Sequence, residues 1–99
     1  MSRFDLYRGA GYSDYLLDVQ SDYTDFLDSR VVIPVVSPEK MTEINPRLHV
    51  ILDIHGQRYH LVTNMMGAVI ARSLGRPVTN LADQSHDVIS AIDFLLQGF

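Results

Sequence analysis

Residues 48–65 read LHVILDIHGQRYHLVTNM, and the main part of the fold follows from them. Two runs, Leu48–Ile54 and Tyr59–Met65, alternate apolar and polar side chains, which is the pattern of a strand with one buried face. The connection between them contains Gly56-Gln57, which suits a two-residue type II′ turn with glycine at its first central position. The stretch therefore predicts an antiparallel β-hairpin.

This turn fixes which residues face each other across the hairpin. The expected pairs are Ile54 with Tyr59, Asp53 with His60, and Ile51 with Val62. Alternation then divides the side chains between two faces. The expected core face consists of Leu48, Val50, Leu52, Ile54, Tyr59, Leu61, Thr63 and Met65. The expected water face consists of His49, Asp53, His55, Arg58, His60 and Asn64. A shift of one residue would exchange the faces.

Short apolar runs broken by turn-forming residues predict further strands outside the hairpin. Their expected bounds are Phe4–Tyr7, Tyr15–Val19, Val31–Val36 and Ala68–Ala71. The polar stretch between Gln20 and Arg30 is expected to be a long connection. Because Pro34 has no N–H to donate, the strand that contains it is predicted to be an edge strand or to carry a bulge.

From Asp83 onward the apolar residues recur every three or four positions, which predicts a C-terminal helix. Asp83 or Ser85 suits its N-cap, and Asp87 in the first turn favours the helix dipole. Gly98 suits the left-handed position after the last turn. The expected apolar stripe is Val88, Ile89, Ile92, Leu95 and Leu96. The predicted fold class is mostly β (α+β), with antiparallel strands followed by one α-helix.

The composition predicts one small domain, residues 1–99, with 46% hydrophobic residues and no cysteine. A chain this short buries a modest core, so a second subunit would add stability. The lack of cysteine excludes disulfides, thiolate metal sites and thiol nucleophiles, and favours a cytoplasmic location. Neither a signal segment nor a membrane span is expected. A net charge of −4 argues against nucleic acid as the primary ligand.

Six aspartates in the first 28 residues predict a solvated acidic face, with a basic partner or a hard cation as the open alternative. The expected Asp53–His60 pair could act as a general base, but it lacks a nucleophile and is better explained as a surface ion pair. His49 and His55 are too far apart along a strand, roughly 20 Å, for one metal. The residues favour binding over catalysis.

Other features point to a subunit interface. Met65-Met66-Gly67 combines two adaptable thioethers with a glycine, and it suits either a core or a contact between subunits. The terminal Phe99 follows a glycine, so it either docks on the core or is presented to a partner.

Two motifs carry a resemblance to a known family. Residues 18–22 read DVQSD and residues 30–34 read RVVIP. With Met65-Met66, the segment Ala91-Ile92-Asp93 and a chain end of glycine plus one apolar residue, the sequence resembles the CcdB family of toxins nearly end to end. The resemblance implies an SH3-like barrel with a C-terminal helix, a homodimer, and no cofactor or enzymatic activity.

The resemblance also implies a function. Such proteins are the stable half of a type II toxin–antitoxin pair, often in plasmid maintenance, and inhibit DNA gyrase, a type II topoisomerase. They insert their paired C-terminal ends into the dimer of gyrase A subunits and trap cleaved DNA. The antitoxin wraps the toxin, releases gyrase and, with the toxin, represses their operon, so DNA contact is only indirect.

By resemblance, gyrase-binding residues fall at two places in this chain. The first is the C-terminal end, and the second follows DVQSD. The positions are Asp93, Leu96, Gln97, Gly98 and Phe99, together with Tyr23 and Thr24. Gln97 stands where the family has tryptophan, and Asp93 where it often has asparagine. The expected dimer interface comprises Met65, Met66, Gly67 and Val69.

Two alternatives stay open. A homologue with Gln97 in place of the tryptophan could have lost gyrase poisoning and serve as an antitoxin-binding partner or operon co-repressor. The same small barrel also resembles the MazF/Kid endoribonuclease toxins. The acidic charge and the absence of a basic, aromatic-lined groove weigh against the endoribonuclease alternative.

Overall fold

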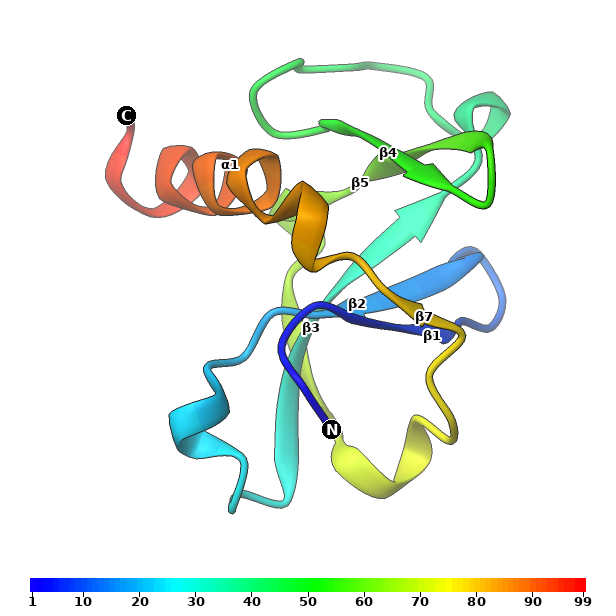
Figure 1. Cartoon of the computed structure of the whole chain (residues 1–99). Coiled ribbons are helices and arrows are strands. Elements are labelled where there is room, and N and C mark those ends of the chain that lie inside the picture. Colours follow the sequence, from blue (N-terminus) through cyan, green and yellow to red (C-terminus); the bar gives the residue numbers. More distant parts are fainter.

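The computed structural model describes residues 1–99, which form a curled half-barrel sheet with one helix at the C-terminus (Figure 1). The strands are β1 Asp5–Arg8, β2 Tyr15–Asp18, β3 Ser29–Val36, β4 Ile51–Ile54, β5 Gln57–Leu61, β6 Gly67–Ile70 and β7 Thr79–Asn80. The α-helix is α1 Ser85–Gln97. Five 3-10 turns lie between them: η1 Asp22–Thr24, η2 Pro38–Lys40, η3 Thr63–Met65, η4 Ala71–Ser73 and η5 Ala82–Gln84. The predicted fold class is confirmed.

The sheet is antiparallel throughout, in the order β4-β5-β3-β2-β1-β7, with β6 also paired to β3. The eight-residue β3 is the central strand, because β2 lies on one side of it and both β5 and β6 lie on the other. The short strand β7, which pairs with β1, was not predicted. Its two residues are too few to produce an alternation that a sequence pattern could show.

Pro34 lies in the middle of this central strand, so the prediction of an edge strand or a bulge was wrong. On the side of β3 opposite β2, β5 pairs with Val35–Val36 and β6 pairs with Ser29–Val32. Pro34 falls between the two pairings, where its carbonyl accepts a hydrogen bond from Val62 N–H at 2.9 Å. Its missing N–H therefore coincides with the break between two partner strands, and the Val62 carbonyl, which an N–H at position 34 would face, accepts from Met65 N–H at 2.9 Å instead.

The predicted hairpin is present, but its turn lies one residue earlier than expected. The central residues are His55 and Gly56, with φ of 52° and 81°, so the turn is type I′ rather than II′. The observed pairs are Ile51 with His60, Leu52 with Tyr59, Asp53 with Arg58, and Ile54 with Gln57. The register differs from the prediction by two residues, which leaves the side chains of β4 and β5 on their predicted faces.

Burial confirms most of the two predicted hairpin faces. Leu52, Ile54 and Leu61 are buried on the core face, while Met65 is an exception with 60% exposure because β5 ends at Leu61 and the chain turns into η3. His60 was expected to face water but is buried, and its Nδ1 lies 3.1 Å from the carbonyl oxygen of His49.

The helix α1 packs on one side of the curled sheet (Figure 1) and buries Val88 and Ala91. Asp87 in the first turn and the left-handed Gly98 are as predicted. The N-cap prediction was wrong, since Gln84 occupies that position and uses its side chain elsewhere. Of the expected apolar stripe, Ile89 and Leu96 are exposed. None of the helices combines the length and the apolar character that a membrane span requires.

One main cluster of buried residues fills the curled sheet. Its members come from five strands, from the segments around them and from α1: Phe4, Leu6, Leu17, Val19, Ile33, Val35, Leu52, Ile54, Leu61, Leu81 and Val88. A smaller cluster of Tyr7, Val32 and Leu74 lies on the opposite face of the sheet. Residues on both faces of β3 are therefore buried, as expected of a central strand.

Candidate functional site

The last four residues, Leu96–Phe99, form an exposed C-terminal arm. Gly98 adopts a φ of 82°, and its N–H donates to the carbonyl of Phe94 at 3.0 Å, which ends the helix. Beyond it, the Phe99 side chain is 76% exposed, and that of Leu96 is 67% exposed. Gln97 is also exposed. The left-handed glycine thus directs a large aromatic side chain away from the core.

A groove of about 290 Å³ lies between the arm, the helix and the loop that precedes β4. Its lining residues are Pro46, Arg47, Val50, Asp87, Ser90, Asp93 and Phe99. The Arg47 guanidinium lies 4.0 Å from the centre of the Phe94 ring, a cation–π contact that holds the loop against the helix. Asp93, which the resemblance places among the binding residues, is half-buried beside this contact.

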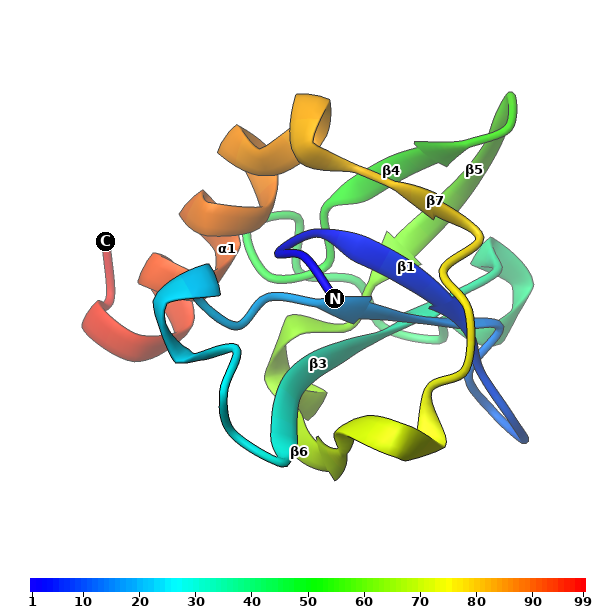
Figure 2. The same cartoon turned by 60° about the horizontal axis from the view of Figure 1, so that its bottom comes forward.

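The second predicted binding segment is the η1 turn. Ser21 caps it, because its Oγ accepts a hydrogen bond from Tyr23 N–H at 3.2 Å and its carbonyl accepts one from Thr24 Oγ1 at 2.9 Å. The side chain of Tyr23 is 94% exposed, whereas Thr24 is half-buried. In Figures 1 and 2, η1 and the C-terminal arm lie on the same left-hand side of the molecule.

The segment predicted to form the dimer interface is divided between η3 and β6. Met65 and Gly67 are exposed, while Met66 packs against the main core and Val69 against the smaller cluster. Ile70 at the end of β6 is 52% exposed. Strand β6 pairs only with β3, so its other edge is free, and Figure 2 shows it at the lower end of the molecule.

The predicted Asp53–His60 pair does not exist. In the observed register Asp53 lies opposite Arg58, and its carboxylate accepts a hydrogen bond from Gly56 N–H at 3.0 Å to brace the turn. His49 uses Nδ1 to accept from Asn45 N–H at 3.0 Å, and its Nε2 lies 2.8 Å from Asn64 Oδ1. No group of three His, Cys, Asp or Glu side chains could hold a metal ion.

The six N-terminal aspartates do not form one solvated face. Asp18 is completely buried, Asp22 accepts from Arg3 N–H at 2.8 Å, and Asp5 accepts from Ser2 N–H at 2.9 Å. Asp14 accepts from Lys40 Nζ at 3.0 Å and from Ser37 N–H at 2.7 Å. Burial alone would raise the pKa of Asp14, but these hydrogen bonds and the Lys40 charge outweigh it and lower that pKa. Most of these carboxylates therefore organise the fold.

A buried ion pair beneath the smaller cluster was missed by the sequence analysis. Arg30 Nε donates to Asp18 Oδ2 at 2.7 Å, and Nη2 lies 2.7 Å from the same oxygen. Burial of Tyr7 beside this pair, together with the charges of Asp5 and Asp18, raises the pKa of Tyr7 to about 12. Alternation along β3 places Arg30 on the same face as Val32, which was the available signal for its burial.

Comparison with known protein families gives one finding. The family model described as CcdB protein matches residues 3–98 of the 99-residue chain. The match includes both motifs, the η1 turn and all of the C-terminal arm except Phe99.

Proposed function

The chain belongs to the CcdB family, and on this premise we propose that it inhibits DNA gyrase by binding the gyrase A subunit through its C-terminal arm. Membership of the family indicates the toxin of a toxin–antitoxin pair. To this family role the proposal adds gyrase binding, a homodimer and co-repression of the operon.

The observation that carries the proposal is the exposure of Phe99. A terminal phenylalanine is expected to fold back onto the core, because burying such a side chain stabilises a small domain by roughly 1.5 to 3 kcal/mol. Here the side chain is 76% exposed beyond a left-handed glycine, with the exposed Leu96 one turn of helix earlier. Exposed apolar side chains on an ordered element suit an anchor for a partner.

Gln97 changes the chemistry of this anchor. A buried tryptophan commonly contributes about 2 kcal/mol or more to binding, and an amide cannot replace its apolar area. In the proposed complex, Phe99 supplies the aromatic contact and Leu96 the neighbouring apolar one, while the exposed Gln97 offers hydrogen bonds. Tyr23, whose side chain is 94% exposed, belongs to η1, which lies on the same side of the molecule as the C-terminal arm in Figures 1 and 2.

The proposed assembly is a twofold dimer that presents two C-terminal arms to the paired A subunits of one gyrase. A twofold interface must be self-complementary, and an exposed, adaptable apolar segment suits that requirement. Met65, Gly67, Ile70 and the free edge of β6 supply such a segment, with Met66 and Val69 beneath it. We place the dimer contact there.

The proposed mechanism requires no covalent chemistry from this chain. Gyrase itself cleaves DNA, and a protein that binds the cleaved state more tightly than the resealed state increases its population. A hundredfold difference in affinity, about 2.7 kcal/mol, shifts the ratio of the two states a hundredfold. The antitoxin would reverse the effect by binding the same dimer and removing the toxin from gyrase.

In the second candidate function, the protein binds its antitoxin and co-represses the operon without poisoning gyrase. Gln97, in place of the family tryptophan, is the observation that favours it. It requires the same fold and dimer but no affinity of the C-terminal arm for gyrase.

The test is a DNA-cleavage and supercoiling assay with gyrase from the same organism, using the purified protein beside its Gln97→Trp and Phe99→Ala variants. If the wild type traps cleaved DNA and Phe99→Ala does not, the proposal stands. If only Gln97→Trp traps cleaved DNA, the second candidate replaces it. Trapping that survives Phe99→Ala would refute the role given to the arm, and RNA cleavage by the pure protein would favour the endoribonuclease alternative.

A further inference from the structure

We infer that Gln20 is a positioning residue, whose side chain holds the η1 turn rigid so that Tyr23 is presented to gyrase in one orientation. The inference rests on the proposed function, because it concerns how one candidate gyrase-binding residue is held. It also gives the DVQSD motif a physical role that the fold alone does not require.

The carboxamide of Gln20 connects the turn to the central strand. Its Oε1 accepts a hydrogen bond from Val31 N–H at 2.9 Å, and its Nε2 donates to the carbonyl of Thr24 at 3.0 Å. Only 9% of the residue is exposed. Both polar ends of the side chain are therefore satisfied away from bulk water, which makes the connection short and rigid.

The backbone of Gln20 is fixed from below by the buried ion pair. Asp18 Oδ1 accepts from Gln20 N–H at 3.0 Å, while Asp18 Oδ2 accepts from Arg30 Nε at 2.7 Å. Asp18 and Arg30 are 0% and 1% exposed. Gln20 thus extends a buried network toward the surface, where it meets η1.

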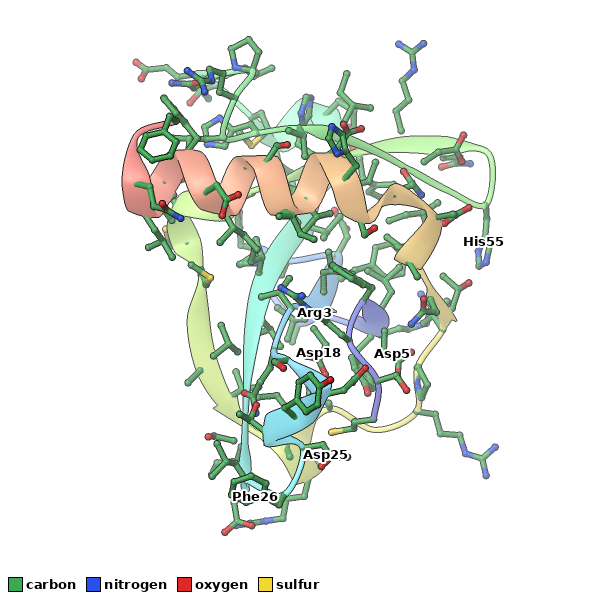
Figure 3. The ribbon with its side chains drawn as sticks, turned by 60° about the vertical axis from the view of Figure 1, so that its left-hand side comes forward. Arg3, Asp5, Asp18, Asp25, Phe26 and His55 are labelled. Carbon is green, nitrogen blue, oxygen red and sulfur yellow. The ribbon has the colours of Figure 1, made fainter.

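Arg3 holds the turn from the other side. Its backbone N–H donates to Asp22 Oδ1 at 2.8 Å, and its Nε donates to the carbonyl of Val19 at 2.9 Å. Figure 3 shows Arg3 and Asp18 beside this turn, with Asp25 and Phe26 further along the same loop. Asp22, on one side of Tyr23, is therefore tied to Arg3, and Thr24, on the other side, is tied through Gln20 to β3.

Each letter of DVQSD has a place in this arrangement. Val19 lies in the main core, Ser21 caps the turn, and Asp22 receives Arg3. Tyr23 is the first residue after the motif, and its side chain is 94% exposed and makes no hydrogen bond that would fix its position. The network orders the backbone that carries Tyr23 and leaves the ring free for a partner.

Such pre-organisation increases affinity without adding a contact. A binding residue on a mobile loop loses backbone entropy when its partner arrives, and that loss weakens binding. If the turn is ordered before binding, that loss does not reduce the affinity. Removal of the Gln20 connection should therefore weaken gyrase binding, although Gln20 itself is covered by its own chain and need not touch gyrase.

The experiment compares Gln20→Met with Gln57→Met in the full-length protein. Methionine keeps the length of the side chain and removes both hydrogen bonds, and Gln57 is exposed on β5 with no side-chain hydrogen bond. Two properties are measured: the Kd for the gyrase A subunit, and the hydrogen exchange of the Thr24 and Asp25 amides, which donate to Ser21 and Asp22. We expect about tenfold weaker binding and about tenfold faster exchange for Gln20→Met only.

A double-mutant cycle with Tyr23→Ala shows whether Gln20 acts through Tyr23. We expect Gln20→Met to have little further effect on the Kd once Tyr23 is removed. Equal effects with and without Tyr23 would overturn the inference, since they would indicate a general loss of structure. The Gln20→Glu variant, which keeps the acceptor for Val31 and loses the donor to Thr24, repeats the cycle if Gln20→Met does not fold.

The two readouts separate this inference from the proposed function. If the wild type does not bind gyrase, the proposed function fails and the role of Gln20 in gyrase binding fails with it, whatever the exchange shows. If the wild type binds and Tyr23→Ala weakens binding, but Gln20→Met changes neither Kd nor exchange, only the inference fails. Faster exchange with an unchanged Kd would also overturn it, because the rigidity of the turn would then not contribute to binding.

Discussion

The side-chain amide of Gln84 pairs with the main chain of Asp53 as a neighbouring strand would. Asp53 N–H donates to Gln84 Oε1 at 2.9 Å, and Gln84 Nε2 donates to the Asp53 carbonyl at 2.8 Å. Strand β4 is an end strand of the sheet, and this pair satisfies part of its otherwise open edge. Because Gln84 is also the N-cap residue of α1, the same amide attaches the helix to the hairpin.

We predict that Gln84→Ala lowers the free energy of unfolding by about 1 to 3 kcal/mol, since two hydrogen bonds are lost and the Asp53 backbone groups return to water. Urea denaturation measures the change. The matched control is Gln57→Ala, whose side chain is exposed and makes no hydrogen bond, and which should change stability by less than about 0.5 kcal/mol. Equal effects of the two substitutions would contradict the strand-like role of Gln84.

Asp18→Asn is predicted to lower the free energy of unfolding more than Gln84→Ala does, by about 3 kcal/mol or more. It leaves the Arg30 guanidinium buried without a counter-charge, and such breaks in buried ion pairs cost about 3 to 5 kcal/mol. Thermal and urea unfolding provide the measurement. Asp83→Asn, an exposed aspartate with no side-chain hydrogen bond, is the control and should be nearly neutral. A similar small effect at Asp18 would mean that water reaches the pair.

Tyr7→Phe should protect the fold at alkaline pH. The folded state holds the pKa of Tyr7 at about 12, against 10.0 for an ordinary tyrosine, so the folded protein keeps the phenol proton longer than the unfolded chain does. The contribution of the Tyr7 phenol to the free energy of unfolding is fully present below pH 10. Between pH 10 and 12 it falls by about 1.4 kcal/mol per pH unit. Urea unfolding across that range should show a shallower decline for Tyr7→Phe than for the wild type.

The same substitution tests whether the Tyr7 hydroxyl matters at neutral pH. That hydroxyl is buried and makes no hydrogen bond, so its removal should leave stability unchanged or slightly raised. Tyr23→Phe changes an exposed phenol and is the control, which should match the wild type in stability at pH 7. A large loss of stability in Tyr7→Phe at pH 7 would show that the hydroxyl has a partner in solution.

Phe99→Ala is predicted to abolish growth inhibition on expression while leaving the melting temperature and the dimer intact. The side chain is 76% exposed, so little core packing is lost, whereas a central aromatic contact to a partner commonly contributes about 2 kcal/mol or more. Growth curves and size-exclusion chromatography measure the two properties. Ile51→Ala removes a comparably exposed apolar side chain from β4 and should stay toxic. Unchanged toxicity of Phe99→Ala would contradict the binding role of the arm.

Gly98→Ala should weaken gyrase binding, but less than Phe99→Ala does. A φ of 82° is unfavourable for any residue with a Cβ, by about 1 kcal/mol, although nothing lies within 4 Å of the position that the Cβ would occupy. The substitution therefore favours other backbone conformations that redirect Phe99, without a steric clash. We expect a gyrase affinity about fivefold weaker than that of the wild type, measured by titration.

Features that depend on local periodicity could be predicted from the amino-acid sequence. Alternation placed the side chains of β4 and β5 on their faces, and an error of two residues in register left those faces unchanged because the period of a strand is two. The helical period after Asp83 and the glycine before the last residue predicted the helix and its left-handed end. The motifs DVQSD and RVVIP led to the family that the comparison shows.

Tertiary packing decided the other features: which strand is central, which charges are buried and which apolar residues are exposed. Pro34 is tolerated in β3 because two separate strands share that side of it, and Asp18 is buried because Arg30 arrives from the neighbouring strand. Leu96 follows the helical pattern but is 67% exposed. Local pattern sets the direction of a side chain, whereas burial and pairing depend on what residues distant in the sequence place opposite it.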